Sequence, residues 1–270
     1  MLTFIPTPIG NPQDITIRAL REFEKATLFL CEDTRETKRL LRLLEERFDF
    51  EYPDVEFLSF HEHNGAKRLE MIASRLTDEN VVYVSDAGMP VISDPGQILV
   101  EYCQKNRVEY DVLPGASAVV TAYASSGFKD GKFLFYGFLP SKGAERSLEL
   151  ISIMNRTDNS VLYEAPHRIE KLIDEIANID ENRELFFAKE ISKKFQTYHR
   201  GSAKEILEIF KTANLKGEWV VVISAKEEKA KALYLDDILA FDLQPKVKAK
   251  LLSKITDKNV KYWYNKLILD

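Results

Sequence analysis

The chain has 270 residues, a formal net charge of −5 and 45% hydrophobic residues. This content can fill one large or two ordinary cores, and no run reaches the roughly 18 uninterrupted apolar residues that a membrane span needs. The negative charge argues against bulk adsorption to nucleic acid, although it leaves room for a local basic patch. The first residues carry no basic leader, and Cys31 and Cys103 lie in apolar segments. We therefore expect a cytoplasmic protein with two buried thiols.

Short β-rich apolar runs alternate with helical patterns from the first residue onward. The predicted strands are 2–5, 27–31, 55–60, 81–84 and 110–113. Apolar residues at helical spacing lie between them, near 17–23, 40–48, 69–76 and 98–103. Strands that alternate with helices of this length predict an α/β domain with a largely parallel sheet, over residues 1–115.

The alternation continues less regularly in a second α/β domain, which we predict over residues 116–225. Its strand candidates are 133–136, 161–163, 185–188 and 219–223, with helices at about 167–178 and 202–213. From residue 226 the composition changes to an excess of lysine over acidic residues, with short helical patterns and no strand. Residues 226–270 are therefore predicted to form a small helical appendage.

Three loops rich in glycine and proline follow predicted strands of the first domain. They read PTPIGNPQD (6–14), SDAGMPVISDPG (85–96) and PGAS (114–117). Ligands of open α/β sheets bind outside the carboxyl ends of the strands, and glycine lets the backbone approach them closely. Any one of these loops could be a plain turn, but three together indicate a ligand site. None matches a dinucleotide or triphosphate motif, and Asp86 and Asp94 favour a cationic ligand.

Eight segments of the chain carry motifs that occur together, in this order, in one family. They are TPIGNPQDITIRAL, CEDTRETKRLL, SFHEHN, SDAGMPVISDPG, PGASAV, FYGFLPSKGAER, YEAPHR and AKEISKKFQTYHRG. Over residues 1 to about 225 the chain resembles the ribosomal RNA small subunit methyltransferase I family, which has the tetrapyrrole-methylase fold of the class III methyltransferases. Its tail is loosely similar to that family's small domain, which resembles a helix-turn-helix.

The resemblance implies an enzyme that methylates the ribose 2′-hydroxyl of a cytidine in the decoding centre of 16S rRNA. It implies S-adenosylmethionine as cofactor, bound in the cleft between the two α/β domains, and the assembled small ribosomal subunit as partner. It also implies a homodimer. Two alternatives remain: methylation of a tetrapyrrole, since a fold does not determine a substrate, and a non-catalytic factor that binds the ribosome and the cofactor.

The resemblance assigns cofactor contacts to the three glycine- and proline-rich loops. The implied contacts are Pro8, Gly10, Asn11, Asp86, Ala87, Gly88, Pro90, Pro114, Gly115, Ser117 and Ala118. Ser93, Asp94 and Gly96 either contact the cofactor or brace the long loop. One departure from the family pattern is Lys189, which replaces an arginine and so keeps the charge without the bidentate geometry.

A ribose hydroxyl is a weak acid, so a nearby carboxylate, histidine or lysine could assist the reaction as a general base. The candidate catalytic residues are Glu32, Asp33, Arg35, Glu164, Arg168 and Lys189. Asp33 could equally cap the next helix, and Arg35 could hold an RNA phosphate or pair with Glu32. The HEHN segment (61–64) has poor spacing for a metal, because neighbouring side chains of a strand point apart, and no metal is expected.

Lysine and arginine residues in three places suggest contacts with the RNA backbone. The candidates are Lys142 and Arg146 on a loop, Lys193 and Lys194 after a strand, and Lys246 and Lys250 in the tail. Contacts of this kind weaken as the salt concentration rises. The alternative for each is a solvated surface, which is the common role of lysine runs.

Overall fold

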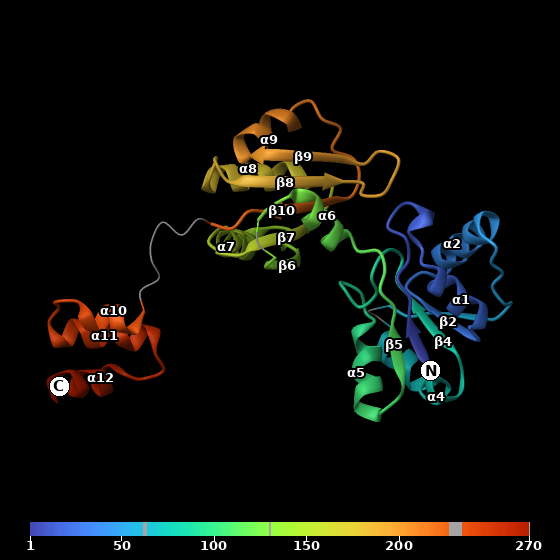
Figure 1. Cartoon of the computed structure of the whole chain (residues 1–270), viewed down its shortest axis with the longest axis horizontal. Helices are drawn as coiled ribbons and strands as arrows, with labels where there is room; N and C mark the ends of the chain where they lie inside the picture. The colour runs from blue at the N-terminus through green and yellow to red at the C-terminus, as the bar shows by residue number, and fades with distance from the viewer. Residues whose placement is uncertain (62–63, 130, 227–233, 270) are drawn as a thin grey trace. The chain divides into compact units, whose positions relative to one another are not determined.

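The computed structural model describes residues 1–61, 64–129, 131–226 and 234–269 (Figure 1). The chain divides into two compact units, Met1–Lys226 and Glu227–Asp270. The first unit contains two five-stranded sheets, and the second contains helices. Within the described residues, no helix combines the length and the apolar character needed to cross a bilayer.

The first sheet is entirely parallel, as the sequence predicts. Its strands are β1 (Leu2–Phe4), β2 (Leu28–Cys31), β3 (Glu56–Ser59), β4 (Val81–Val84) and β5 (Tyr110–Val112), in the order β3-β2-β4-β1-β5. The helical segments along the chain are η1 (Pro12–Asp14), α1 (Ile17–Lys25), α2 (Thr34–Arg47), α3 (Gly65–Ile72), α4 (Arg75–Asp78) and α5 (Gln97–Asn106). The loops that follow β1, β4 and β5 therefore leave the sheet at the same edge.

Apolar side chains cover both faces of this sheet, which explains why its central strands β2 and β4 are continuous apolar runs. Phe29 and Val82 face one core with Phe23 of α1. Tyr83 and its neighbour in space, Phe4, face the opposite core, with their ring centroids 5.5 Å apart. Both cores exclude water from the central strands, so the sheet forms a rigid support for the loops at its edge.

The second sheet is mixed, with only β6 and β7 parallel. Its strands are β6 (Phe133–Phe138), β7 (Asn159–Glu164), β8 (Glu184–Lys189), β9 (Thr197–Ser202) and β10 (Trp219–Ile223), in the order β6-β7-β10-β8-β9. The accompanying helices are α6 (Ala118–Ser126), α7 (Gly143–Met154), α8 (Ile169–Ile179) and α9 (Ala203–Phe210). The edge strand β9 was not predicted, because its polar sequence TYHRGS contains no apolar run.

The second unit consists of α10 (Leu235–Ala240), α11 (Pro245–Ile255) and α12 (Val260–Leu269) over its described residues. Ile238, Leu252 and Trp263 share its small core. The indole Nε1 of Trp263 donates a hydrogen bond to Thr256 Oγ1 at 2.8 Å, so the polar edge of the ring is also satisfied. Trp263 therefore packs inside this unit.

Candidate functional site

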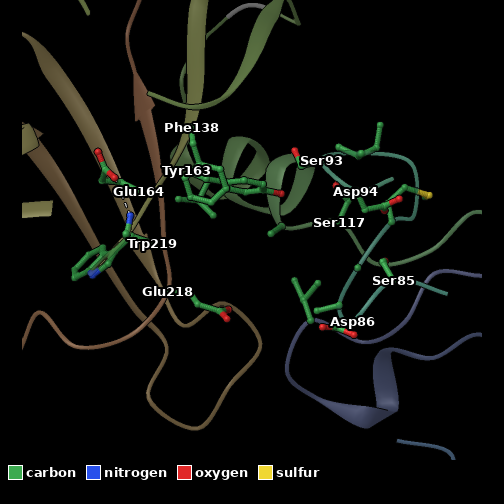
Figure 2. Close-up of a pocket in the computed structure, with 18 of the residues that line it drawn as sticks. Ser85, Asp86, Ser93, Asp94, Ser117, Phe138, Tyr163, Glu164, Glu218 and Trp219 are labelled. Carbon is green, nitrogen blue, oxygen red and sulfur yellow. Dashed lines mark hydrogen bonds between the residues drawn. The ribbon is translucent and has the colours of Figure 1, made fainter. Parts of the chain in front are cut away.

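A pocket of about 530 Å³ lies in the first unit, between the loops of the first sheet and one end of the second sheet (Figure 2). The first wall consists of Ile9, Glu32, Ser85, Asp86, Ala87, Gly88, Met89, Ile92, Ser93 and Asp94, with Ser117 and Ala118 at the start of α6. The second wall consists of Phe138, Tyr163, Glu164, Ala165, Pro166, Glu218, Trp219 and Val220. The volume is in the range of small-molecule and cofactor sites.

Two of the predicted loops are joined directly to each other beside the pocket. The amide N–H groups of Thr7 and Gly88 each donate to the other residue's carbonyl oxygen, both at 3.0 Å. Gly88 has a φ of +83°, and a Cβ atom there would lie 3.1 Å from Ile9 Cγ2. Glycine is therefore required at this position, because any larger residue is strained and crowded.

Asp94 braces the long loop from inside. Its Oδ1 accepts hydrogen bonds from the Tyr83 hydroxyl at 3.0 Å and the Gly96 amide at 2.8 Å, and its Oδ2 accepts one from the Val91 amide at 2.7 Å. Val91 and Ser93 have φ values of 73° and 71°, which L-residues rarely adopt. The loop thus holds an unfavourable backbone shape around a satisfied carboxylate. Burial raises the pKa of Asp94 above its usual range.

The predicted cofactor residues fall into two groups in the structure. Asp86, Ala87, Gly88, Ser93, Asp94, Ser117 and Ala118 line the pocket. The others are not part of the lining: Pro8, Gly10, Asn11, Pro90, Gly96, Pro114 and Gly115. A Cβ on Gly10, for example, would lie 2.5 Å from Lys193 Cγ, so its role is close packing between the two halves of the unit. Contact of any of them with a cofactor stays a prediction.

Glu32 and Asp86 place two carboxylates on the first wall. Glu32 Oε2 accepts a hydrogen bond from the Asp86 amide at 3.3 Å, and Asp86 Oδ1 accepts one from the Asp33 amide at 3.1 Å. Burial raises the pKa of both Glu32 and Asp86, and the Asp86 charge adds to the effect on Glu32. This wall is therefore suited to a positively charged ligand.

Ser85 contributes an unsatisfied polar atom to the same wall. The residue is buried and lines the pocket, and its Oγ has no hydrogen-bond partner among the described residues. A buried hydroxyl without a partner costs free energy, so a ligand that hydrogen-bonds to it gains affinity.

Asp33 and Arg35 lie outside the pocket lining and pair with each other. The Asp33 carboxylate accepts hydrogen bonds from Arg35 Nη2 at 2.7 Å and Nε at 3.2 Å. It also caps α2 by accepting the Arg35 amide at 2.8 Å. These bonds lower the pKa of Asp33 to about 2, so it is a weak base. The prediction that Arg35 could pair with Glu32 is wrong.

Glu164 and Arg168 are locked into a buried ion network. Glu164 Oε1 lies 2.6 Å from Arg168 Nη2 and accepts the Ala165 amide at 2.8 Å, while Oε2 lies 3.0 Å from Arg146 Nη2. Glu164 lines the pocket, but its carboxylate is already satisfied by three donors. It therefore positions the loop that follows β7 rather than presenting a free carboxylate.

Arg146 is not the exposed RNA contact that the sequence predicts. It lies in α7 instead of a loop, and its side chain is buried between Glu164 and Glu175, 2.8 Å from the latter. The sequence predicts that Lys142 and Arg146 lie on a loop, but α7 begins at Gly143, directly after Lys142. Arg146 therefore balances the charges of Glu164 and Glu175 inside the protein.

The remaining predicted cations occupy different environments. Lys189 is buried at the end of β8, where its Nζ donates to the Asn214 carbonyl oxygen, so it does not line the pocket. Lys193 Nζ pairs with Glu190 at 3.0 Å and with Glu218 at 2.8 Å. Four predicted cations remain exposed: Lys142, Lys194, Lys246 and Lys250.

Sequence reasoning missed the aromatic part of the second wall. Phe138 and Tyr163 lie within the quoted motifs FYGFLPSKGAER and YEAPHR, but they were given no role. Phe138 ends β6, and Tyr163 is the last residue but one of the neighbouring strand β7, so the common end of these two strands was the available signal. Within the described residues, no cluster of histidine, cysteine and acidic residues could hold a metal. Glu62 and His63 of the HEHN segment lie outside the described residues.

Solved structures with this fold include methyltransferases of tetrapyrroles. Cobalt precorrin-4 methyltransferase, a cobalamin biosynthetic enzyme, aligns with a TM-score of 0.57 at 16% identity, covering 83% of this chain and 94% of that one. Uroporphyrin-III C-methyltransferase from Thermus thermophilus, complexed with S-adenosyl homocysteine, aligns with a TM-score of 0.56 at 14% identity, covering 83% and 96%. These similarities confirm the predicted fold.

Sequence comparison identifies the family. Residues 1–207 match the family model described as Tetrapyrrole (Corrin/Porphyrin) Methylases. A protein of Helicobacter pylori (strain J99) named ribosomal RNA small subunit methyltransferase I is 41% identical, over 100% of this chain and 98% of its own length. The protein of that name in Campylobacter fetus subsp. fetus (strain 82-40) is 43% identical, over 99% and 100%. The chain therefore belongs to the ribosomal RNA small subunit methyltransferase I family, as its motifs predict.

Proposed function

We propose that this protein methylates the ribose 2′-hydroxyl of a cytidine in the decoding centre of 16S rRNA, on the assembled small subunit and as a homodimer. S-adenosylmethionine is the methyl donor. The observation that supports the proposal most is the pocket, in which acidic, glycine-containing loops face an aromatic wall, in a chain of this family.

The first wall fits S-adenosylmethionine in charge and in shape. Glu32 and Asp86 complement a ligand with a positively charged sulfur and an ammonium group. The Gly88 backbone has no Cβ to block a close approach, and the unpartnered Ser85 Oγ offers a hydrogen bond. When bound, the cofactor supplies an electrophilic methyl group, and these residues orient it and exclude water.

Among the candidate bases, Glu32 is the one that the geometry favours for the hydroxyl proton. Its carboxylate lines the pocket, and burial raises its pKa toward the range where a carboxylate is a useful proton acceptor. The Glu164 carboxylate already forms ion pairs with Arg146 and Arg168, and the lowered pKa of Asp33 makes it a weak base. We assign Glu32 as the general base for methyl transfer.

The exposed lysines are assigned to RNA phosphates. Lys142 and Lys194 lie on the first unit, and Lys246 and Lys250 lie on α11 of the second. Each phosphate contact releases counterions, so binding to the subunit weakens steeply with salt.

The test is transfer of labelled methyl groups from S-adenosylmethionine to small subunits from a strain that lacks this methylation, with naked 16S rRNA in parallel. Modified positions are mapped by reverse-transcription stops at low nucleotide concentration, which report 2′-O-methyl groups. A stop in the decoding centre that requires assembled subunits is the expected result. Methylation of a base, or no transfer to RNA while the cofactor still binds, would refute the proposal.

A further inference from the structure

Phe138 is a large apolar side chain that stays exposed beside the pocket. It is 56% exposed and lines the second wall (Figure 2). Its ring centroid lies 5.4 Å from that of Tyr163, which in turn packs against Phe135 at 5.1 Å. A supported ring with a free surface is an arrangement that can receive a flat ligand.

An irregularity in β6 gives Phe138 this position. The register of β6 against β7 shifts by one residue between Phe135 and Gly137. In an unbroken ladder Phe138 would lie opposite Glu164, whereas the bulge brings it opposite Tyr163. Because neighbouring residues of a strand face opposite sides, this shift moves the phenyl ring to the face occupied by Tyr163.

Gly137 makes the bulge possible. Its φ is +80°, and a Cβ atom there would meet nothing within 4 Å. Glycine is therefore needed for the backbone conformation and not for space, in contrast to Gly88. Bulges next to binding sites commonly redirect one side chain, and here the redirected side chain is Phe138.

The composition of the pocket narrows the kind of group that Phe138 could receive. None of its described lining residues is a lysine, arginine or histidine, while five are acidic: Glu32, Asp86, Asp94, Glu164 and Glu218. A phosphate is disfavoured there, and an uncharged planar ring is suited to the Phe138 face. RNA-binding proteins commonly stack unpaired bases on aromatic side chains in this way.

We propose that the Phe138 ring, supported by Tyr163, is the platform on which the target nucleobase stacks while its ribose reacts. The inference rests on the proposed function and adds the binding surface for the substrate. The first wall carries the groups suited to the cofactor, and the aromatic pair lies on the opposite wall (Figure 2). Stacking the base fixes the nucleotide and so presents its ribose hydroxyl to the pocket.

The experiment compares Phe138→Leu, which keeps an apolar side chain without a flat face, with Phe138→Trp, which restores one. Leu148→Ala is the control for loss of exposed apolar surface, because Leu148 is 68% exposed on α7 and does not line the pocket. Two quantities are measured for each protein: binding of S-adenosylhomocysteine by calorimetry, and kcat/KM for undermethylated small subunits at saturating cofactor. Equilibrium binding of the subunits to the S-adenosylhomocysteine complex gives a readout that does not require turnover.

We expect Phe138→Leu to lower kcat/KM and subunit affinity about ten-fold, with cofactor binding unchanged, and Phe138→Trp to restore both. Weakened S-adenosylhomocysteine binding with normal subunit affinity would show that the ring stacks on the adenine of the cofactor, and would overturn the proposal. Unchanged values throughout would also overturn it. If the wild-type protein transfers no methyl group to subunits, the proposed function is wrong. The stacking proposal is wrong if the subunit affinity of Phe138→Leu equals that of the wild type.

Discussion

Arg146 of α7 and Glu164 of β7 form an ion pair that is hidden from solvent, with Nη2 and Oε2 3.0 Å apart and side chains that are 1% and 0% exposed. Arg146 also contacts Glu175 and the Pro140 carbonyl oxygen. The pair connects α7, the helix after β6, to the end of β7, the strand that carries Tyr163. We therefore expect the Arg146–Glu164 pair to maintain the shape of the second wall, which contains Phe138 and Tyr163.

Replacing Arg146 tests this structural role. Arg146→Met leaves the buried Glu164 carboxylate short of one donor, so we expect a loss of about 3 kcal/mol in the free energy of unfolding. The measurement is urea denaturation followed by circular dichroism. Lys142→Met, an exposed lysine of the same segment, is the matched control and should be near neutral in stability. Wild-type stability for Arg146→Met would contradict the assignment of a structural cation.

Gly88→Ala tests whether the joined loops form the cofactor wall. The substitution imposes a strained φ and places a methyl group 3.1 Å from Ile9 Cγ2. The free energy of unfolding should therefore be about 1–2 kcal/mol lower than that of the wild type. Affinity for S-adenosylhomocysteine should fall as well. Gly131→Ala is the control, because a Cβ there meets nothing within 4 Å. Full cofactor affinity in Gly88→Ala would remove this loop from the proposed site.

The pH dependence of methyl transfer should follow Glu32. Because its folded pKa is raised, the carboxylate is protonated at a pH where an ordinary glutamate is already ionised, and activity should fall as the pH drops through that raised value. Glu32→Gln should reduce kcat about 10²- to 10⁴-fold and remove this acidic limb. Single-turnover rates across the pH range provide the measurement.

The raised pKa of Glu32 also makes stability depend on pH, but in the opposite direction to activity. The folded protein binds the Glu32 proton more tightly than the unfolded chain, so its contribution to stability is lost as the pH rises through the folded pKa. At neutral pH, Glu32→Gln should therefore be at least as stable as the wild type. A variant that loses both stability and activity would indicate a structural carboxylate instead of a base.

Asp33→Asn distinguishes the helix cap from a catalytic role. Asparagine is also a good cap, so activity and stability should both stay close to wild type although the Arg35 pair is lost. Asp33→Ala removes the cap and should lower the free energy of unfolding by about 1 kcal/mol. Loss of activity in the asparagine variant, with stability retained, would restore Asp33 as a base candidate.

The three central strands of the first sheet, β1, β2 and β4, could be predicted from the sequence because each is short, mostly apolar and buried. Val81–Val84 is such a run, and the loop after it is marked by its glycines and prolines. β9 could not be predicted in the same way. It is an edge strand whose polar residues are held in the sheet by pairing with β8. Such pairing depends on a different segment of the chain, so the sequence of β9 itself shows no strand pattern.

The candidate site shows the same division. The acidic and glycine-rich wall was predictable, because its residues follow one another along single loops. Burial of Arg146 was not, because it depends on Glu164 and Glu175, which reach it from other elements. The Phe138 position depends on a bulge, and a one-residue shift of register cannot be read from the pattern of one strand.

The place of β1 in the first sheet has a consequence for the order in which the protein folds during synthesis. Leu2 pairs with Val81 on one side and with Tyr110 on the other. The first strand of the chain therefore cannot pair until β4 and β5 have been synthesised. The reciprocal bonds between Thr7 and Gly88 likewise join the loop after β1 to the loop after β4. A nascent chain that ends before β4 would expose β1 without a neighbour, and it would lack the part of the first wall that Ser85, Asp86 and Gly88 supply. Binding of a ligand to the first wall would therefore report that β1 has paired with β4.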